Sequence, residues 1–169
     1  HDLLLIAAAG HLNVVIERLD VTDQESIDAV AGKYRATPID VLINNAGILV
    51  NNDRQKLGAY DMAVFDEVMD VNNKGPIRMV EAFVDHVAAS DQKKIMSISS
   101  AVGSIEMTFG GQVFYRASKA ALNISIPTLA QYLRPPAAPR PTPLLCRPLH
   151  PWPLHTAVPT PVPAPTPRT

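Results

Sequence analysis

The chain has 169 residues, of which 47% are hydrophobic and 18% are charged, and its formal net charge is −1. This length suits a single domain with a buried core, and the near-neutral charge gives no electrostatic reason to expect nucleic acid as a partner. One cysteine excludes an intramolecular disulfide, and the histidines lack the clustered spacing of a metal site. The apolar run from Leu3 to Ala9 is too short to span a bilayer. We therefore expect a soluble cytoplasmic protein without a metal site or a membrane partner.

The composition divides the chain into two unlike parts. Residues 1–134 hold all eight glycines, only three prolines and a net charge of −4, whereas residues 135–169 hold 13 prolines, no glycine and a net charge of +3. Proline donates no backbone hydrogen bond and disfavours both helices and central strands. We predict a folded domain over 1–134 and an extended or disordered Pro-rich tail over 135–169. Because the sequence begins at His1 inside an apparent element, we interpret the chain as a fragment.

Strand and helix patterns alternate along residues 1–134. Thr22 and Glu25 have the spacing of a capping box at the start of a helix, and Pro127 is expected to interrupt the last helix. Apolar runs and helical periodicity predict strands at Asn13–Leu19, Ile39–Ile43 (buried on both faces) and Ile95–Ile98, and helices over 22–36, 61–73, 76–89 and Ala117–Leu133. Strands separated by helices pair in parallel, so the predicted class is α/β.

Ligands of such sheets bind beyond the carboxyl ends of the strands, which directs attention to the residues that follow each run. The strand Ile39–Ile43 is followed by Asn44-Asn45-Ala46-Gly47. Amide side chains can tie neighbouring loops together, and the small pair Ala46-Gly47 lets a flat ligand approach the backbone. The same four residues are also compatible with an ordinary strand-to-turn transition.

A phenol and an ammonium follow the last predicted strand. Tyr115 and Lys119 are four residues apart and therefore share one face of the predicted helix. A free tyrosine has a pKa of about 10 and is a poor proton donor at neutral pH, but a nearby cation stabilises the phenolate. Ser100, in the loop after Ile95–Ile98, is a candidate hydrogen-bond donor to a substrate oxygen. Each of these features taken alone also fits a solvated helix face or an ordinary loop.

In their order and spacing, these motifs resemble the short-chain dehydrogenase/reductase family. The resemblance extends over roughly residues 10–126. It rests on Asp20-Val21, Asn44-Asn45-Ala46-Gly47, Asp70-Val71-Asn72-Asn73-Lys74-Gly75, Ile98-Ser99-Ser100 and Tyr115-Arg116-Ala117-Ser118-Lys119. The sequences Gly103-Ser104-Ile105 and 115–123 are most similar to the C-factor and sniffer-type carbonyl reductase branch. The fold that it implies is a Rossmann-like, doubly wound parallel sheet, here truncated at the N-terminus.

The resemblance implies an NAD(P)-dependent oxidoreductase that interconverts a small-molecule carbonyl and its alcohol. Tyr115 would be the general acid or base, Ser100 would hold the substrate oxygen, and Lys119 would favour the phenolate and bind the nicotinamide ribose. Asn72 would position a water that links Lys119 to solvent, with Asn73 as the alternative.

The cofactor implied is NADP or NAD, which carries the hydride. The cofactor-binding residues implied are Tyr115 and Lys119 at the nicotinamide end, and Asp20, Val21, Asn44, Ala46 and Gly47 along the adenosine half. Members of the family also often form homo-oligomers through their long helices.

The sequence departs from the family pattern at the phosphate-binding turn. The motif Thr-Gly-x-x-x-Gly-x-Gly, which cradles a pyrophosphate at a helix N-terminus, is not found in these 169 residues. This departure and the Pro-rich tail leave a second interpretation open, a non-catalytic α/β interaction or signalling module with a Pro-rich arm. They also leave open that the fragment is inactive.

Overall fold

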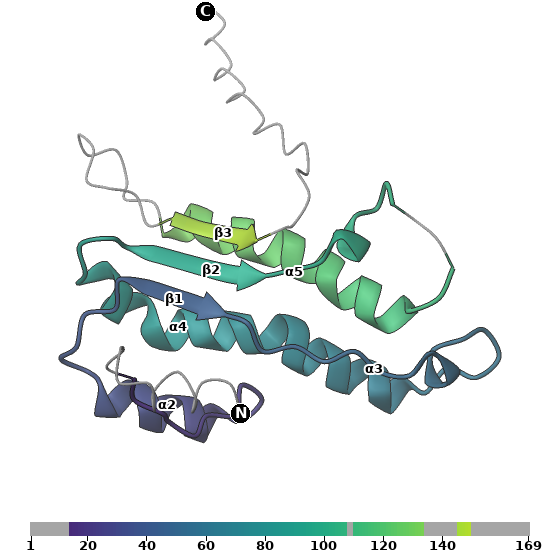
Figure 1. The fold of residues 1–169 in the computed structure, drawn as a ribbon, viewed down its shortest axis with the longest axis horizontal. Helices are drawn as coiled ribbons and strands as arrows, with labels where there is room; N and C mark the ends of the chain where they lie inside the picture. Colours follow the sequence, from purple (N-terminus) through teal and green to yellow (C-terminus); the bar gives the residue numbers. More distant parts are fainter. Residues whose placement is uncertain (1–13, 108–109, 134–144, 150–169) are drawn as a thin grey trace, which may run out of the picture.

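The computed structural model describes residues 14–107, 110–133 and, as backbone, 145–149. Helices and strands alternate along these residues, as the sequence predicts (Figure 1). The elements are α2 (Gln24–Lys33), β1 (Val41–Asn44), η1 (Asn52–Arg54), α3 (Met62–Met69), the π-helical turn η2 (Asp70–Lys74), α4 (Gly75–Ala88), β2 (Lys94–Ile98), η3 (Ala101–Gly103), α5 (Val113–Tyr132) and β3 (Leu145–Leu149).

The three strands form a parallel sheet in the order β1-β2-β3. Leu42 of β1 pairs with Ile95 of β2, which pairs with Cys146 of β3. Helix α4 packs on β1 and β2, α5 packs on β3, and both helices pass behind the strands in Figure 1. The arrows point the same way, so the carboxyl ends of the strands meet at one edge, next to α3 and the first half of α5. The α/β class is therefore confirmed.

The core lies between the sheet and the helices. It consists of Ile27, Leu42, Val80, Phe83, Val87, Ile95, Leu122 and Ile126. Strand side chains alternate between faces, so Leu42 points to the helices while its neighbour Ile43 is 54% exposed. The prediction that Ile39–Ile43 is buried on both faces is therefore wrong for Ile43, because the described helices α4 and α5 lie on one side of the sheet.

The predicted strand at Asn13–Leu19 is not observed over its described residues. Residues 14–20 have no regular secondary structure, and Asn13 lies outside the described part of the chain. The segment makes its contacts through side chains, because Glu17 accepts hydrogen bonds from the Lys33 ammonium at 2.5 Å and from the Tyr34 hydroxyl. Within the described sheet, the strands begin with β1, so this β-branched stretch has no neighbouring strand to extend.

The first residue of α2 is capped differently from the predicted capping box. Asp23 is the N-cap, and its carboxylate accepts a hydrogen bond from the Glu25 amide at 3.0 Å. Thr22 instead donates its hydroxyl to Asp20 at 2.7 Å. The Thr22 cap is thus wrong by one residue, because the carboxylate of Asp23 competes for the same amides.

Pro127 does not interrupt the last helix. Helix α5 continues from Val113 to Tyr132 with Pro127 inside it. A proline within a helix costs about 3 kcal/mol, but Leu122 and Ile126 on the same helix are completely buried. Burial of such side chains contributes about 1.5–3 kcal/mol each, which offsets the lost hydrogen bond.

The Pro-rich tail contributes a strand to the sheet. Leu145–Leu149 pairs with β2 as β3, so these five residues of the predicted extended or disordered tail are extended and form a regular edge strand. Pro148 is tolerated because β3 pairs only with β2 in the described sheet and forms its edge. The rest of the predicted tail, 134–144 and 150–169, lies outside the described residues.

Candidate active site

The ends of β1 and β2 are joined by a buried polar contact. Asn44 donates from Nδ2 to the Ser97 hydroxyl at 3.1 Å, and both side chains are buried. The Oδ1 atom of Asn44 has no hydrogen-bond partner in the described part of the chain. Beyond this contact, residues 45–47 are exposed, so Ala46 and Gly47 present their backbone to solvent at the carboxyl edge of the sheet.

Asn72 holds the loop that follows β1. It lies in the π-helical turn between α3 and α4 and is completely buried. Its Oδ1 accepts from the Ile48 amide at 2.8 Å, and its Nδ2 donates to the Ile48 carbonyl and to the Ser118 hydroxyl, both at 2.9 Å. This side chain therefore connects the loop after β1, the α3–α4 junction and α5.

Gly47 provides the space next to this network. A Cβ at position 47 would lie 3.3 Å from Asn72 Oδ1 and 3.6 Å from Lys119 Nζ. The structure therefore brings together three of the residues that the sequence singles out, Gly47, Asn72 and Lys119. A hydrogen atom in place of a side chain leaves a shallow cradle in front of the ammonium.

Lys119 is buried and faces Tyr115. Its side chain lies one turn after Tyr115 on α5, and Nζ is 5.7 Å from the centre of the tyrosine ring. The Lys119 residue is only 4% exposed, and Nζ donates to the Ile98 carbonyl at 2.9 Å. Burial lowers the pKa of Lys119 below its ordinary value, because desolvation disfavours the charged form. The two groups thus share one face of α5, as their spacing predicts.

The two serines after β2 have different surroundings. Ser99 is buried, and its hydroxyl donates to Asn123 Oδ1 at 2.5 Å. Ser100 is half-buried and caps the short helix η3 by accepting a long hydrogen bond of 3.4 Å from the Val102 amide. Ser100 therefore retains its hydroxyl proton for another acceptor, whereas Ser99 does not.

The Ser100 loop is docked on α5 through Gly103. A Cβ at position 103 would lie 2.8–2.9 Å from the backbone carbonyl carbon and the Cβ of Lys119. Asn123 also donates to the Gly103 carbonyl at 3.4 Å. Only glycine allows this approach, which places the loop against the turn of α5 that carries the ammonium. No hydrogen bond joins Ser100 to Tyr115 in the part of the chain that the structure describes.

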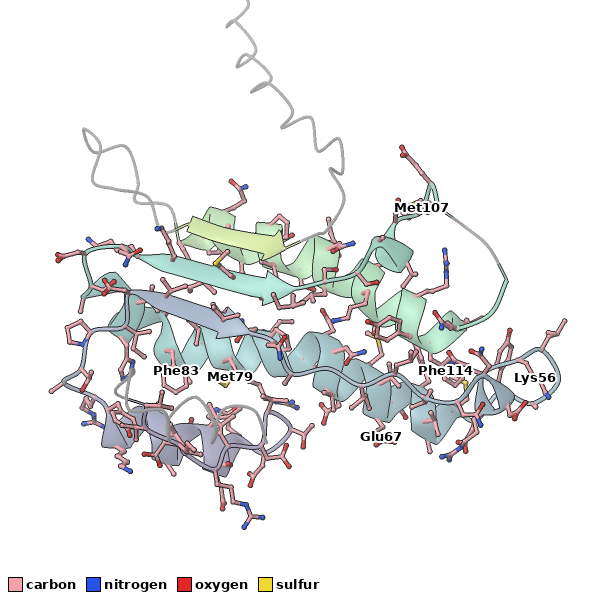
Figure 2. The ribbon with its side chains drawn as sticks, viewed as in Figure 1. Lys56, Glu67, Met79, Phe83, Met107 and Phe114 are labelled. Carbon is pink, nitrogen blue, oxygen red and sulfur yellow. The ribbon has the colours of Figure 1, made fainter. Side chains whose placement is uncertain are left out.

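The start of α5 is fixed by Gln55, which the sequence gives no reason to select. Gln55 is 1% exposed, accepts from the Phe114 amide at 3.0 Å and donates to the Val50 carbonyl at 2.9 Å. Figure 2 shows Phe114 projecting from α5 toward α3, where its ring lies 5.1 Å from that of Phe65. Gln55 thus ties the start of α5, one residue before Tyr115, to the loop after β1.

Asp20 and Val21 lie apart from the catalytic candidates. Asp20 Oδ1 accepts from the Thr22 amide at 2.8 Å and from its hydroxyl, and these hydrogen bonds lower the pKa of the exposed carboxyl. Val21 packs against Gly75, where a Cβ would lie 3.0 Å from its side chain. Over the described ranges, no hydrogen bond joins this turn to Lys119 or Tyr115, so the structure separates the predicted cofactor residues into two groups.

Three further residues support the site and escaped the sequence analysis: Gln55, Ser97 and Ser118. Ser118 accepts from Asn72 and donates to the Tyr115 carbonyl at 2.8 Å. Its position between Tyr115 and Lys119 was a possible signal, since it follows Tyr115 by three residues. Ser97 lies opposite Asn44 only through the strand register, and Gln55 has no local signature at all.

The described residues offer no group of three or more His, Cys, Asp or Glu side chains that could hold a metal ion. Among the same residues, none of the helices has the length and apolar character needed to cross a membrane.

Comparisons with known proteins identify the family of the chain. The family model of short chain dehydrogenases matches residues 5–137. The chain belongs to the short-chain dehydrogenase family. It therefore shares the Rossmann-like α/β fold of this family.

Individual relatives show how far the similarity extends. C-signal from Myxococcus xanthus is 36% identical over 99 residues, which cover 58% of this chain and 58% of that protein. The NADPH-bound carbonyl reductase from chicken fatty liver has a TM-score of 0.68 and 31% identity, covering 78% of this chain and 57% of that one. Carbonyl reductase Sniffer of D. melanogaster has a TM-score of 0.72 and 26% identity, covering 88% and 63%. The chain spans about half the length of the curated relatives that it matches.

Proposed function

We propose that this chain carries the catalytic residues of an NAD(P)-dependent oxidoreductase that interconverts a carbonyl compound and its alcohol, with Tyr115 as the proton donor or acceptor. The observation that carries the proposal is the buried Lys119 ammonium, 5.7 Å from the centre of the Tyr115 ring. A positive charge held at this place stabilises the phenolate that remains when Tyr115 gives its proton to a carbonyl oxygen. Family membership and the NADPH-bound neighbour support the same assignment.

Ser100 is the proposed hydrogen-bond donor to the substrate oxygen. Its hydroxyl accepts from Val102, so its own proton is free to bind the oxygen on which negative charge develops. Ser99 is unsuited to this role because its hydroxyl donates to Asn123. Ser100 and Tyr115 are both half-buried, so each keeps part of its surface accessible to a small molecule.

Asn72 is the proposed holder of a water that passes protons from Lys119 to solvent. The hydrogens of its amide are committed to Ile48 and Ser118, so its backbone carbonyl is the group for this water. In an α-helix this carbonyl would accept from the residue four positions on, which is Pro76 and has no N–H. Asn73 is a poorer candidate, because it makes none of the hydrogen bonds by which Asn72 joins Ile48 and Ser118.

The residues present fit the ribose of a dinucleotide. The Lys119 ammonium would donate to the ribose hydroxyls beside Gly47, and Ala46 and Gly47 would leave the backbone open to the cofactor. Asn44 holds this edge together through Ser97, while Asp20 and Val21 would border the adenine. The cofactor, NADP or NAD, supplies or accepts the hydride.

We also propose that two copies associate through the long helices, as the sequence predicts. Ile124 and Tyr132 of α5 are 68% and 81% exposed, respectively, and supply an apolar surface for this contact.

Replacing Tyr115 tests the proposed function. Tyr115→Phe removes the proton donor but keeps the ring, so carbonyl-dependent oxidation of NADPH or NADH is expected to fall about a hundredfold to ten-thousandfold. Tyr132→Phe is the matched control, because it removes a hydroxyl from the exposed end of the same helix. Turnover that persists undiminished in Tyr115→Phe contradicts the proposal.

A further inference from the structure

A charged side chain joins the Asp20–Thr22 turn to the α3–α4 junction. Arg78 of α4 donates from Nη1 to the Val21 carbonyl at 3.2 Å and from Nη2 to Asp70 Oδ1 at 2.8 Å. The Arg78 side chain is 25% exposed and that of Asp70 is 28% exposed, so both are largely shielded from water. One guanidinium therefore contacts two segments that are about 50 positions apart in the sequence.

The turn is held from two sides. Its other hydrogen bonds are local: Asp20 with Thr22, and the Asp20 amide with the Ser26 hydroxyl at 3.0 Å. These bonds fix the shape of the turn, orient the Asp20 carboxylate and tie the turn to the start of α2. Its contacts with the α3–α4 junction are the packing of Val21 on Gly75 and the guanidinium.

The other end of the contact lies at the catalytic side. Asp70 is the first residue of the π-helical turn and precedes Asn72 by two positions, and its carbonyl accepts from the Gly75 amide. Lys74 also approaches Asp70 Oδ1, at 3.6 Å, whereas the Val21 carbonyl accepts its hydrogen bond from Arg78. Arg78 is thus the described side chain that makes hydrogen bonds to both places.

From these contacts we propose that Arg78 is a positioning residue that holds the adenosine-side turn of the cofactor site in register with the Asn72 junction. This inference rests on the proposed function, because it takes the Asp20–Val21 turn as the border of the adenine. A guanidinium suits the task because its rigid fork donates in two directions at once. A lysine ammonium at the same position reaches one of the two acceptors at a time.

The test compares the two halves of the cofactor. Binding of AMP and of reduced nicotinamide mononucleotide to the 169-residue chain is measured by calorimetry for wild type, Arg78→Met, Arg78→Lys and Lys74→Met. In Arg78→Met we expect AMP to bind about tenfold more weakly and the nicotinamide mononucleotide to bind as in wild type. Arg78→Lys restores part of the loss, and the control Lys74→Met changes neither affinity.

Amide hydrogen exchange separates this role from general destabilisation. In Arg78→Met the Thr22 amide, which bonds to Asp20, is expected to exchange faster, while the Ile48 amide, which bonds to Asn72, keeps its rate. Unchanged AMP affinity with an unchanged Thr22 rate overturns the inference, and so does an equal loss of both nucleotides with faster exchange at Ile48. A wild-type chain that binds neither nucleotide overturns the proposed function itself, and the cofactor role of Arg78 with it.

Discussion

The Asn72 network and the Asp20–Thr22 turn both contribute to the proposed cofactor site, but they are held in different ways. The hydrogen bonds of Asn72 reach residues 24 and 46 positions away and are buried or half-buried. Those of Asp20 reach residues two and six positions away and are exposed. The comparison teaches that the Asn72 network is fixed by the tertiary fold. The Asp20–Thr22 turn has a locally determined shape, and Arg78 is the residue that we propose holds it in register with the Asn72 junction.

The largest expected difference between the two regions concerns stability. Asn72→Ala leaves the amide and carbonyl of Ile48 without a partner and removes the hydrogen bond that the Ser118 hydroxyl accepts, so the free energy of unfolding is expected to fall by about 3 kcal/mol. Thr22→Ala in the turn is the matched control and is expected to change it by less than about 0.5 kcal/mol. Urea unfolding measures both. Equal losses would show that the two regions do not differ in this way.

Substitution of two glycines, Gly103 beside Lys119 and Gly75 beside the Asp20–Thr22 turn, extends the comparison of the two regions. Gly103→Ala places a Cβ 2.8 Å from the Lys119 backbone, which has no room to move, so we expect a loss of about 2–3 kcal/mol in the free energy of unfolding. Gly75→Ala meets only the side chain of Val21 at 3.0 Å, which can shift, and we expect about 1 kcal/mol.

Gly32 provides the control for these substitutions. A Cβ at position 32 of α2 meets nothing within 4 Å, so Gly32→Ala is expected to stabilise the chain by up to about 1 kcal/mol. Thermal unfolding of Gly103→Ala, Gly75→Ala and Gly32→Ala ranks the three variants by stability. A Gly75→Ala variant that is less stable than Gly103→Ala would contradict it.

The smallest expected effect is the pH dependence due to Lys119. Its folded pKa lies below that of the unfolded chain, about 10.4, because burial disfavours the ammonium. At a pH below the pKa of the folded state, Lys119 is charged in both the folded and the unfolded chain. Burial of the ammonium then lowers the free energy of unfolding by its full amount. As the pH rises from there toward 10.4, the unfolded state binds more protons, so stability increases with pH. Lys119→Met is expected to abolish this increase in urea unfolding between pH 7 and 10.

The exposed Lys56 serves as the comparison for that titration. Its side chain is 63% exposed, so Lys56→Met is expected to leave the increase with pH in place. An increase that survives in Lys119→Met, or that disappears in Lys56→Met, would mean that another group is responsible.

Local patterns predicted most elements and failed where distant parts of the chain intervene. The helices around residues 61–89 and the strand at Ile95–Ile98 were predicted because apolar spacing is a local property. The stretch Asn13–Leu19 has the composition of a strand, yet its described residues bind the end of α2 through Glu17. Pro127 has the local signature of an interruption, but burial of its neighbours keeps α5 continuous.

The sequence by itself determined the alternation of elements, the family, and the pairing of the catalytic candidates Tyr115 and Lys119, since these two need only one turn of helix between them. The tertiary structure alone decided which polar groups support them. Ser97 meets Asn44 through the strand register, Gln55 meets the start of α5, and Arg78 meets Val21 across the fold. These partners are far apart in the chain, so no local sequence pattern predicts that they meet. They are selected when the buried core brings their backbones together and each buried polar atom must find a partner.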